Sequence, residues 1–150
     1  MKTEMQVLEH LATLIPDGLK KHLASDNTRD GISELNVKID FPDIDNMRKD
    51  NMLYLVPEYE NIEELTVSSD RAEFEVKVFI ISKKGNSEAL VKRVFDLYTA
   101  FYLFMRSDPT LGGFIDYSRI TDMDYYPALT ASSTMVAVEV TLILSWAKIY

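Results

Sequence analysis

The side chains that could perform chemistry in this sequence are few, and the two histidines are the first candidates. His10 and His22 lie twelve residues apart, whereas a helical metal site of the HExxH kind places its two histidines four residues apart on one face. We therefore interpret both as surface or boundary residues. The chain contains no cysteine, which excludes disulfides, thiolate metal sites and thiol nucleophiles.

Three aspartates form the second candidate. Asp122 and Asp124 share one face of a predicted strand, and Asp116 lies further along the same face. Neighbouring carboxylates can bind a metal ion or perform acid–base catalysis, but no histidine, lysine or glycine-rich loop accompanies these three in a recognised pattern. We favour a solvated strand face over an enzyme that gathers them in a cleft. We expect no catalytic residue, no cofactor and no metal ion.

The charge and hydropathy of the chain limit its partners. Its 150 residues carry a net charge of −8, which opposes binding to nucleic acid because phosphates require clustered lysine and arginine. The longest uncharged stretch of the central apolar segment, residues 97–105, is far shorter than the roughly 20 residues of a membrane-spanning helix. The first residues lack the apolar region of a signal peptide. We expect synthesis in the cytoplasm, no membrane segment and no sequence-specific nucleic-acid binding.

Two helices are predicted to position these residues. Apolar side chains recur every three or four residues at about 3–23, which indicates an amphipathic helix, although Pro16 is expected to kink or restart it. A longer helix is predicted at about 87–106, where a serine or an asparagine can cap the start and no glycine or proline intervenes. The second half of this helix ends in the run AFYLFM, which is apolar on every side, so another element must cover it.

Strand-like alternation recurs along the rest of the chain. A polar loop at about 42–51, which we expect to be mobile, separates the earlier strands, and Pro57 indicates an edge position or a bulge. The predicted strands are, in chain order, 33–41, 52–56, 62–67, 72–81, 114–126 and 134–150. This order predicts a single α+β domain, residues 1–150. It has a mostly antiparallel sheet of about five strands, with the N-terminal helix and the long helix packed on the sheet.

Two features of these elements point to assembly. The strand at 134–150 would span roughly 55 Å at about 3.3 Å per residue, whereas a domain with a radius of gyration of about 15 Å is only about 40 Å across. The strand therefore either bends within a monomer or projects and pairs with another chain. The apolar end of the second helix also needs a neighbour. Side chains from these two regions are the candidate interface: Tyr102, Phe104, Met105, Leu144, Trp146, Ile149 and Tyr150.

Three segments of the C-terminal half carry a family resemblance. They are the apolar helix ALVKRVFDLYTAFY, the glycine break and strand of LGGFIDYSRITDMDYYP, and the closing strand VAVEVTLILSWAKI. With the N-terminal helix, the strands and the loop that precede them, they resemble the tail-terminator or tail-completion (minor tail) proteins of long-tailed bacteriophages and prophages. The resemblance covers most of the chain and includes no catalytic motif.

The resemblance implies a structural protein rather than an enzyme. Such proteins are compact α+β subunits that form a ring, commonly a hexamer, which caps the tail tube and later faces the head connector. The expected partners are other copies of the chain, the tail tube and head-connector proteins, with the 42–51 loop meeting another tail component. The expected location is the virion tail, after synthesis in the bacterial host cytoplasm. An acidic chain also suits a lumen through which DNA slides.

A binding module of a different class is the alternative function. The sheet and the second helix could enclose an apolar pocket for a small molecule or a peptide, and a deep cavity with converging polar groups would support that function.

Overall fold

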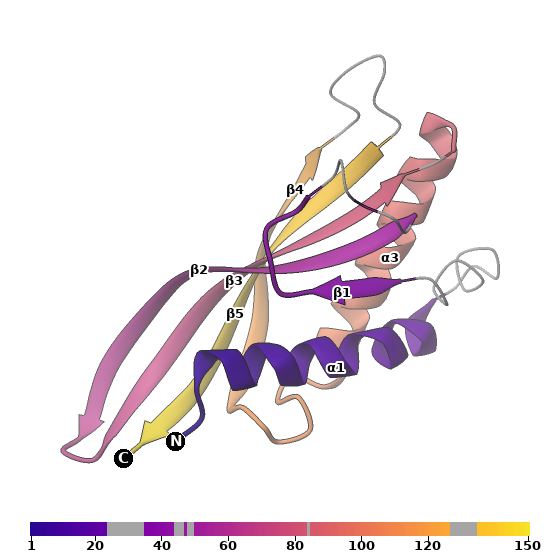
Figure 1. The fold of residues 1–150 in the computed structure, drawn as a ribbon. Helices are drawn as coiled ribbons and strands as arrows, with labels where there is room; N and C mark the ends of the chain where they lie inside the picture. Colours follow the sequence, from indigo (N-terminus) through magenta and orange to yellow (C-terminus); the bar gives the residue numbers. More distant parts are fainter. Residues whose placement is uncertain (24–34, 44–46, 48–49, 84, 127–134) are drawn as a thin grey trace.

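The computed structural model describes residues 1–23, 35–43, 47, 50–83, 85–126 and 135–150. Within them five strands form one sheet in the order β1-β2-β3-β5-β4, accompanied by helices α1 and α3 (Figure 1). The elements are α1 Glu4–His22, β1 Asn36–Lys38, β2 Asn51–Thr66, β3 Ser69–Lys83, α3 Ser87–Ser107, β4 Tyr117–Tyr126 and β5 Met135–Ile149. β1 is parallel to β2, and the other neighbouring strands are antiparallel. This confirms the predicted α+β fold with a mostly antiparallel sheet.

One face of the sheet carries the main core. Leu55, Val78 and Val140 lie in register on three adjacent strands, and all three are completely buried. They belong to the same cluster as the apolar stripes of α1 and α3, so both helices pack on this face. Full burial of each such side chain contributes about 1.5–3 kcal/mol relative to exposure. The helix-covered face is therefore the main source of stability.

α1 is one continuous helix. Thr3 and Gln6 cap its first turn reciprocally, since each side chain accepts the backbone N–H of the other at 3.2 and 3.0 Å. The restart predicted at Pro16 is absent. The proline removes one backbone donor, while Ile15 and Leu19 on either side of it are completely buried against the core, so packing holds the helix together.

β2 joins into one strand the two short strands predicted on either side of Pro57. The register with β3 shifts between Pro57 and Tyr59, which confirms the bulge predicted at the proline. The Lys83 N–H donates to the Asp50 carbonyl oxygen at 2.8 Å, so alternate β2 residues bond to β3, and the backbone of Pro57 faces the other way. The missing proline N–H therefore costs no hydrogen bond to β3.

β5 does not project alone, which is one of the two alternatives that the predicted strand at 134–150 leaves open. It pairs with β3 along its full length, from Met135 opposite Lys83 to Ile149 opposite Ser69. Figure 1 shows that β2, β3 and β5 extend together beyond the helices, toward the lower left of the view. The length of the terminal strand is thus matched by two neighbours of its own chain.

Three predicted boundaries change. Only three residues of the predicted strand 33–41 form β1, and residues 33–34 lie outside the described ranges. Half of the loop predicted at 42–51 lies outside them too, and Asn51 already belongs to β2. Met47 is buried in a smaller cluster with Met52 on the second face of the sheet. β4 begins at residue 117 instead of 114, because the preceding residues form turns.

The apolar end of α3 is covered by α1. Gly18 brings the α1 backbone so close to Phe104 that a Cβ at position 18 would stand 2.4 Å from Cδ1 of the phenylalanine ring. The neighbour that the apolar run requires is therefore the first helix of the same chain. In the described part of the chain, no helix is both long and apolar enough to cross a membrane.

Replacing Gly18 by alanine tests this contact. The added methyl group overlaps the Phe104 ring, so we expect a loss of about 1–3 kcal/mol of unfolding free energy, despite the roughly 1 kcal/mol by which alanine favours a helix. Urea unfolding followed by circular dichroism measures the loss. In a Phe104→Leu background the cost of Gly18→Ala should fall by at least about 0.5 kcal/mol, and an unchanged cost would contradict the close contact.

Candidate assembly surface

Both histidines join α1 to other segments. His10 stacks on Phe114 with ring centroids 4.2 Å apart, and its Nε2 lies 3.0 Å from the Leu111 carbonyl oxygen. His22 lies 3.3 Å from the hydroxyl of Ser107 in the last turn of α3. The two rings therefore contact different parts of the chain and do not form a common site.

The aspartates do not all share one face. Asp122 and Asp124 are exposed on β4, in register with alternate residues of β5. Asp116 precedes the first residue of β4, so the prediction that it shares their strand face is wrong. Within the described ranges, no three histidine or acidic side chains come close enough together to hold a metal ion.

Four of the seven predicted interface side chains belong to the core instead. Two of them lie on α3, where α1 contacts Phe104 and Met105 lies next to β4. The other two lie on the helix-covered face of β5. At most 6% of each is exposed: Phe104, Met105, Leu144 and Trp146. The other three are 41, 65 and 65% exposed: Tyr102, Ile149 and Tyr150. Leu103 is also exposed beside Tyr102, and the apolar run AFYLFM was the signal that could have identified it.

One end of the sheet is an arm made of three strands, in which β2 and the tip are exposed while Ala72, Phe74, Leu144 and Trp146 remain buried. We define the arm as residues 57–66 of β2, 69–75 of β3 and 143–149 of β5, together with the turn that joins β2 to β3. It starts at the β2 bulge and extends beyond both helices (Figure 1). Several of its apolar side chains are exposed: Tyr59, Ile62, Leu65, Val67 and Ile149. A group of exposed apolar side chains is typical of a surface that another molecule covers.

The outer edge of β2 is open along the arm. β1 pairs only with residues 52–54, and within the described residues no strand covers 57–66. The Lys83 N–H points toward β2, so the backbone groups of odd-numbered β3 residues bond to β2. The β2 residues opposite them, such as Asn61, direct their own backbone groups toward β3. The intervening backbone groups therefore face outward; these belong to Glu60, Ile62 and Glu64. The edge is also acidic, with four glutamates and no lysine or arginine between residues 57 and 66.

The outer edge of β5 is open at its end. Pairing with β4 stops at Ser145, whose carbonyl oxygen accepts the Asp116 N–H at 2.9 Å. The Tyr150 N–H points the other way and donates to the Ser68 carbonyl oxygen, in the turn before β3, at 2.9 Å. By alternation, the backbone groups of Ala147 and Ile149 share the side on which Ser145 meets Asp116, and no described strand occupies that side.

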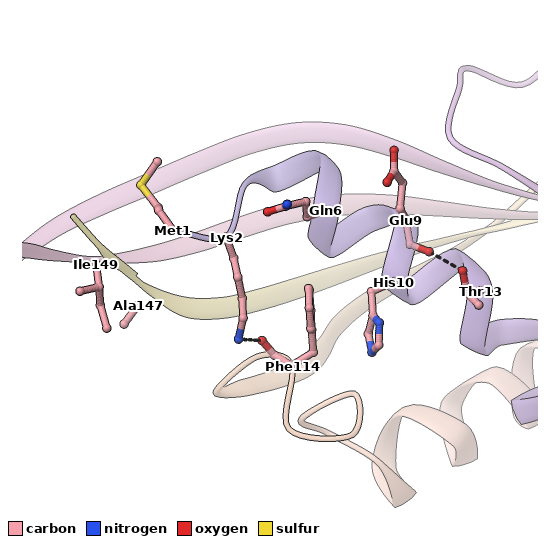
Figure 2. Close-up of a pocket in the computed structure, with 9 residues that line it drawn as sticks. All are labelled: Met1, Lys2, Gln6, Glu9, His10, Thr13, Phe114, Ala147 and Ile149. Atoms are coloured by element: carbon pink, nitrogen blue, oxygen red, sulfur yellow. Dashed lines mark hydrogen bonds between the residues drawn. The ribbon is translucent and has the colours of Figure 1, made fainter.

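A groove of about 640 Å³ runs beside this open edge (Figure 2). Ala147 and Ile149 line one side of it, and the first turns of α1 together with Phe114 line the other. The Lys2 side chain crosses the groove, donates to the Phe114 carbonyl oxygen and lies 4.7 Å from the centre of its ring. The Phe114 wall is fixed by its stacking on His10, so the groove is already formed in the free chain.

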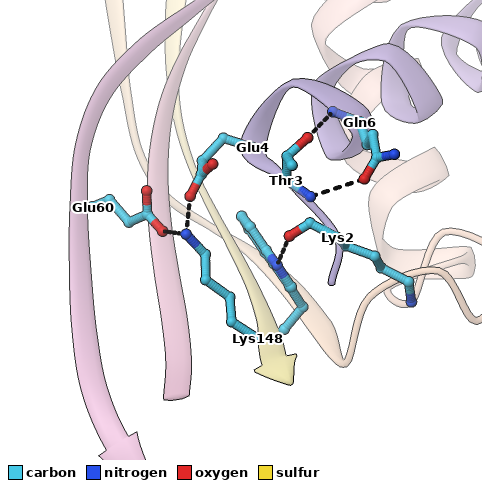
Figure 3. Close-up of polar contacts among 7 residues, drawn as sticks. Lys2, Thr3, Glu4, Gln6, Glu60 and Lys148 are labelled. Carbon is cyan, nitrogen blue, oxygen red and sulfur yellow. Dashed lines mark hydrogen bonds and ion pairs between the residues drawn. The ribbon is translucent and has the colours of Figure 1, made fainter. Parts of the chain in front are cut away.

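Lys148 joins the arm to the start of α1 (Figure 3). Its ammonium contacts the Glu4 carboxylate and forms an ion pair with Glu60 at 2.9 Å. Burial is the largest single influence on the pKa of Glu4 and acts to raise it, but the hydrogen bond from Lys148, two further hydrogen bonds and the charge of Lys148 together lower that pKa. Burial, together with the facing Glu4 carboxylate, raises the pKa of Glu60. The Trp146 indole donates to the Lys2 carbonyl oxygen at 3.1 Å, so two neighbouring positions of β5 hold the N-terminal segment.

The interface between the sheet and the second helix, where the alternative function places an apolar pocket, is packed with buried side chains. Leu97 and Phe101 of α3 are completely buried and fill that interface together with Val140. A hollow of about 340 Å³ lies instead between the end of α3 and β4, with Tyr102 and Arg119 among its walls.

No family model matches the chain, and no curated protein matches it. Among solved structures, one similar chain comes from the virion of a native gene transfer agent particle. The match covers 89% of this chain and 94% of that chain, with a TM-score of 0.38 and 8% sequence identity. A likeness at this level carries no argument about function.

Removing the Lys148 ammonium tests the link between the arm and α1. Lys148→Met leaves two carboxylates facing each other, so we expect a loss of about 1–2 kcal/mol of unfolding free energy at pH 7. Because the pKa of Glu4 is lowered from 4.5, its contribution is present above pH 4.5 and fades as the pH falls through the lowered value. The difference from wild type should therefore shrink in acid.

Lys20→Met is the matched control for this prediction, because Lys20 is an exposed lysine of the last turn of α1. It should change the unfolding free energy by less than about 0.5 kcal/mol. Urea titrations at pH 7 and pH 3, on either side of the titration of Glu4, provide both comparisons. Equal losses for the two variants, or a Lys148→Met loss that does not depend on pH, would show that the ion pairs do not stabilise the fold.

Proposed function

We propose that the chain is a structural subunit that assembles with copies of itself through the arm. The observation that carries the proposal is the arm itself, which exposes apolar side chains and leaves both outer edges open. Open strand edges are ready to pair with another chain. A subunit that worked as a monomer would keep this surface uncovered, at a risk of aggregation that assembly removes.

We further propose that the assembly is a ring at the end of a phage-type tail, as a tail-terminator or tail-completion subunit. The segments ALVKRVFDLYTAFY, LGGFIDYSRITDMDYYP and VAVEVTLILSWAKI support this assignment through their resemblance to that family. The mechanism is then ordered binding, first to other copies and the tail tube, and later to the head connector. A net charge of −8 suits a ring through which DNA passes without sticking.

An arm substitution tests assembly. Ile62→Asp places a charge on the β2 edge, and Phe41→Asp places one on a residue of similar exposure outside the arm. We expect wild type and Phe41→Asp to form the same oligomer in light scattering and negative-stain images. Ile62→Asp should shift the midpoint of assembly to at least about tenfold higher concentration, equivalent to 1.4 kcal/mol. Assembly of Ile62→Asp at the wild-type concentration would contradict a role for the arm.

A second experiment tests the tail assignment separately. The purified chain should sediment with tail tubes from the phage or prophage that encodes it, and its gene should lie among head and tail genes. A gene located elsewhere, or a chain that assembles but ignores tail tubes, would contradict the tail assignment and leave assembly through the arm standing.

A further inference from the structure

We infer that the two open edges of the arm bind each other in neighbouring copies, so that the β2 edge of one copy enters the groove beside β5 of the next. The inference rests on the proposed assembly function and names its interface. The occupant of the groove is thus a second copy of this chain, and the contact extends the sheet from one copy into the next.

The strand directions fit this contact. β2 and β5 both run antiparallel to β3, so they are parallel to each other within the arm. A second copy in the same orientation therefore presents its β2 parallel to β5. In a parallel ladder, one residue bonds to the two residues that flank its opposite number. We place Ile62 of one copy opposite Lys148 of the next. The outward N–H and C=O of Ile62 then meet the outward backbone groups of Ala147 and Ile149 in that neighbouring copy.

The faces of the sheet also match in this arrangement. Ile62 pairs with Ala72 inside its own copy, and Ala72 pairs with Trp146, so these three side chains share the helix-covered face. Lys148 is two residues from Trp146 and lies on the same face. Placing Ile62 opposite Lys148 therefore continues that face from one copy to the next without turning the sheet over.

Charge favours a second copy as the occupant. The β2 edge is acidic, and Lys2 stands in the groove that would receive it. Among the described residues, the Lys2 ammonium contacts a carbonyl oxygen and an aromatic ring but forms no ion pair with a carboxylate. Arg71 lies beside Ala147 in the register of the sheet. Glu9 also lines the groove, and Arg71 is opposite Glu63 of its own copy, so Lys2 is the cation that the entering glutamates would meet first.

Charge also opposes pairing between two identical edges. Two β2 edges would bring four glutamates against four glutamates, which is unfavourable on neighbouring strands, and two β5 edges would meet over only Ala147 and Ile149. The contact therefore joins two different surfaces. Such a heterologous contact repeats from copy to copy and closes into a ring when the rotation between copies allows it.

Cysteine cross-linking tests the inference directly, because the chain has no cysteine of its own. Asn61→Cys and Ala147→Cys lie side by side across the inferred contact, and each variant carries a different tag. Mixed and treated with a short bis-maleimide, they should give at least about tenfold more cross-linked pairs of unlike chains than Lys38→Cys gives with Ala147→Cys. Lys38 is the matched control, since it is exposed on β1, which pairs with residues 52–54 of β2, before the arm begins.

Ile62→Pro provides the second variant. Its outward N–H takes no part in the pairing of β2 with β3, and edge positions of this kind tolerate proline. We expect the folded arm to remain, with an unchanged circular dichroism spectrum and a cross-linking yield reduced at least about tenfold.

Each outcome decides the inference. Unlike-chain cross-links that Ile62→Pro abolishes support it. Predominant Asn61→Cys pairs with themselves overturn it in favour of a symmetric contact. An oligomer without unlike-chain cross-links overturns it and leaves the proposed function standing. A chain that stays monomeric and uncross-linked at high concentration also overturns it, and the proposed function is then judged by tail-tube binding.

Discussion

β3 and β5 pair residue by residue along fifteen positions each, and the rest of the structure depends on this ladder. Fifteen strand residues extend about 50 Å, whereas the 19 residues of α1 extend only about 28 Å. The helices therefore cover the ladder for part of its length. The cover reaches into the arm as far as Ala72 and Trp146, which are buried, so the exposed part of the arm is its tip together with the second half of β2.

The amino-acid sequence predicts the fold class because alternation and helical periodicity show which side chains share a face. They do not show which elements cover that face. The length of the last strand favours an interface role for Leu144 and Trp146, but α1 and the N-terminal segment cover them. The all-round apolar end of the second helix favours the same role for Phe104, but Gly18 lets α1 close over its ring.

The open strand edges could not be predicted from the sequence, for a related reason. The direction of a backbone N–H depends on which strand pairs on each side, and Ile62 carries no mark of it. The Lys148 contacts were equally hidden, since Glu4 is 144 residues away along the chain. The sequence does indicate a mismatch between two lengths, because the predicted terminal strand is longer than the diameter of a compact domain of 150 residues. This mismatch correctly indicates that part of the sheet extends beyond the helices, although three paired strands form that part and not the terminal strand alone.

The bulge after Pro57 gives the arm a property that its interface residues do not determine. A bulge bends its strand and increases the local twist, so it sets the angle at which the arm leaves the body. Residues 57–66 act as a lever about 30 Å long, and a change of about 10° at its base moves the tip by about 5 Å. Substitutions at the bulge could thus alter the curvature of an assembly while the core and the contact residues stay unchanged.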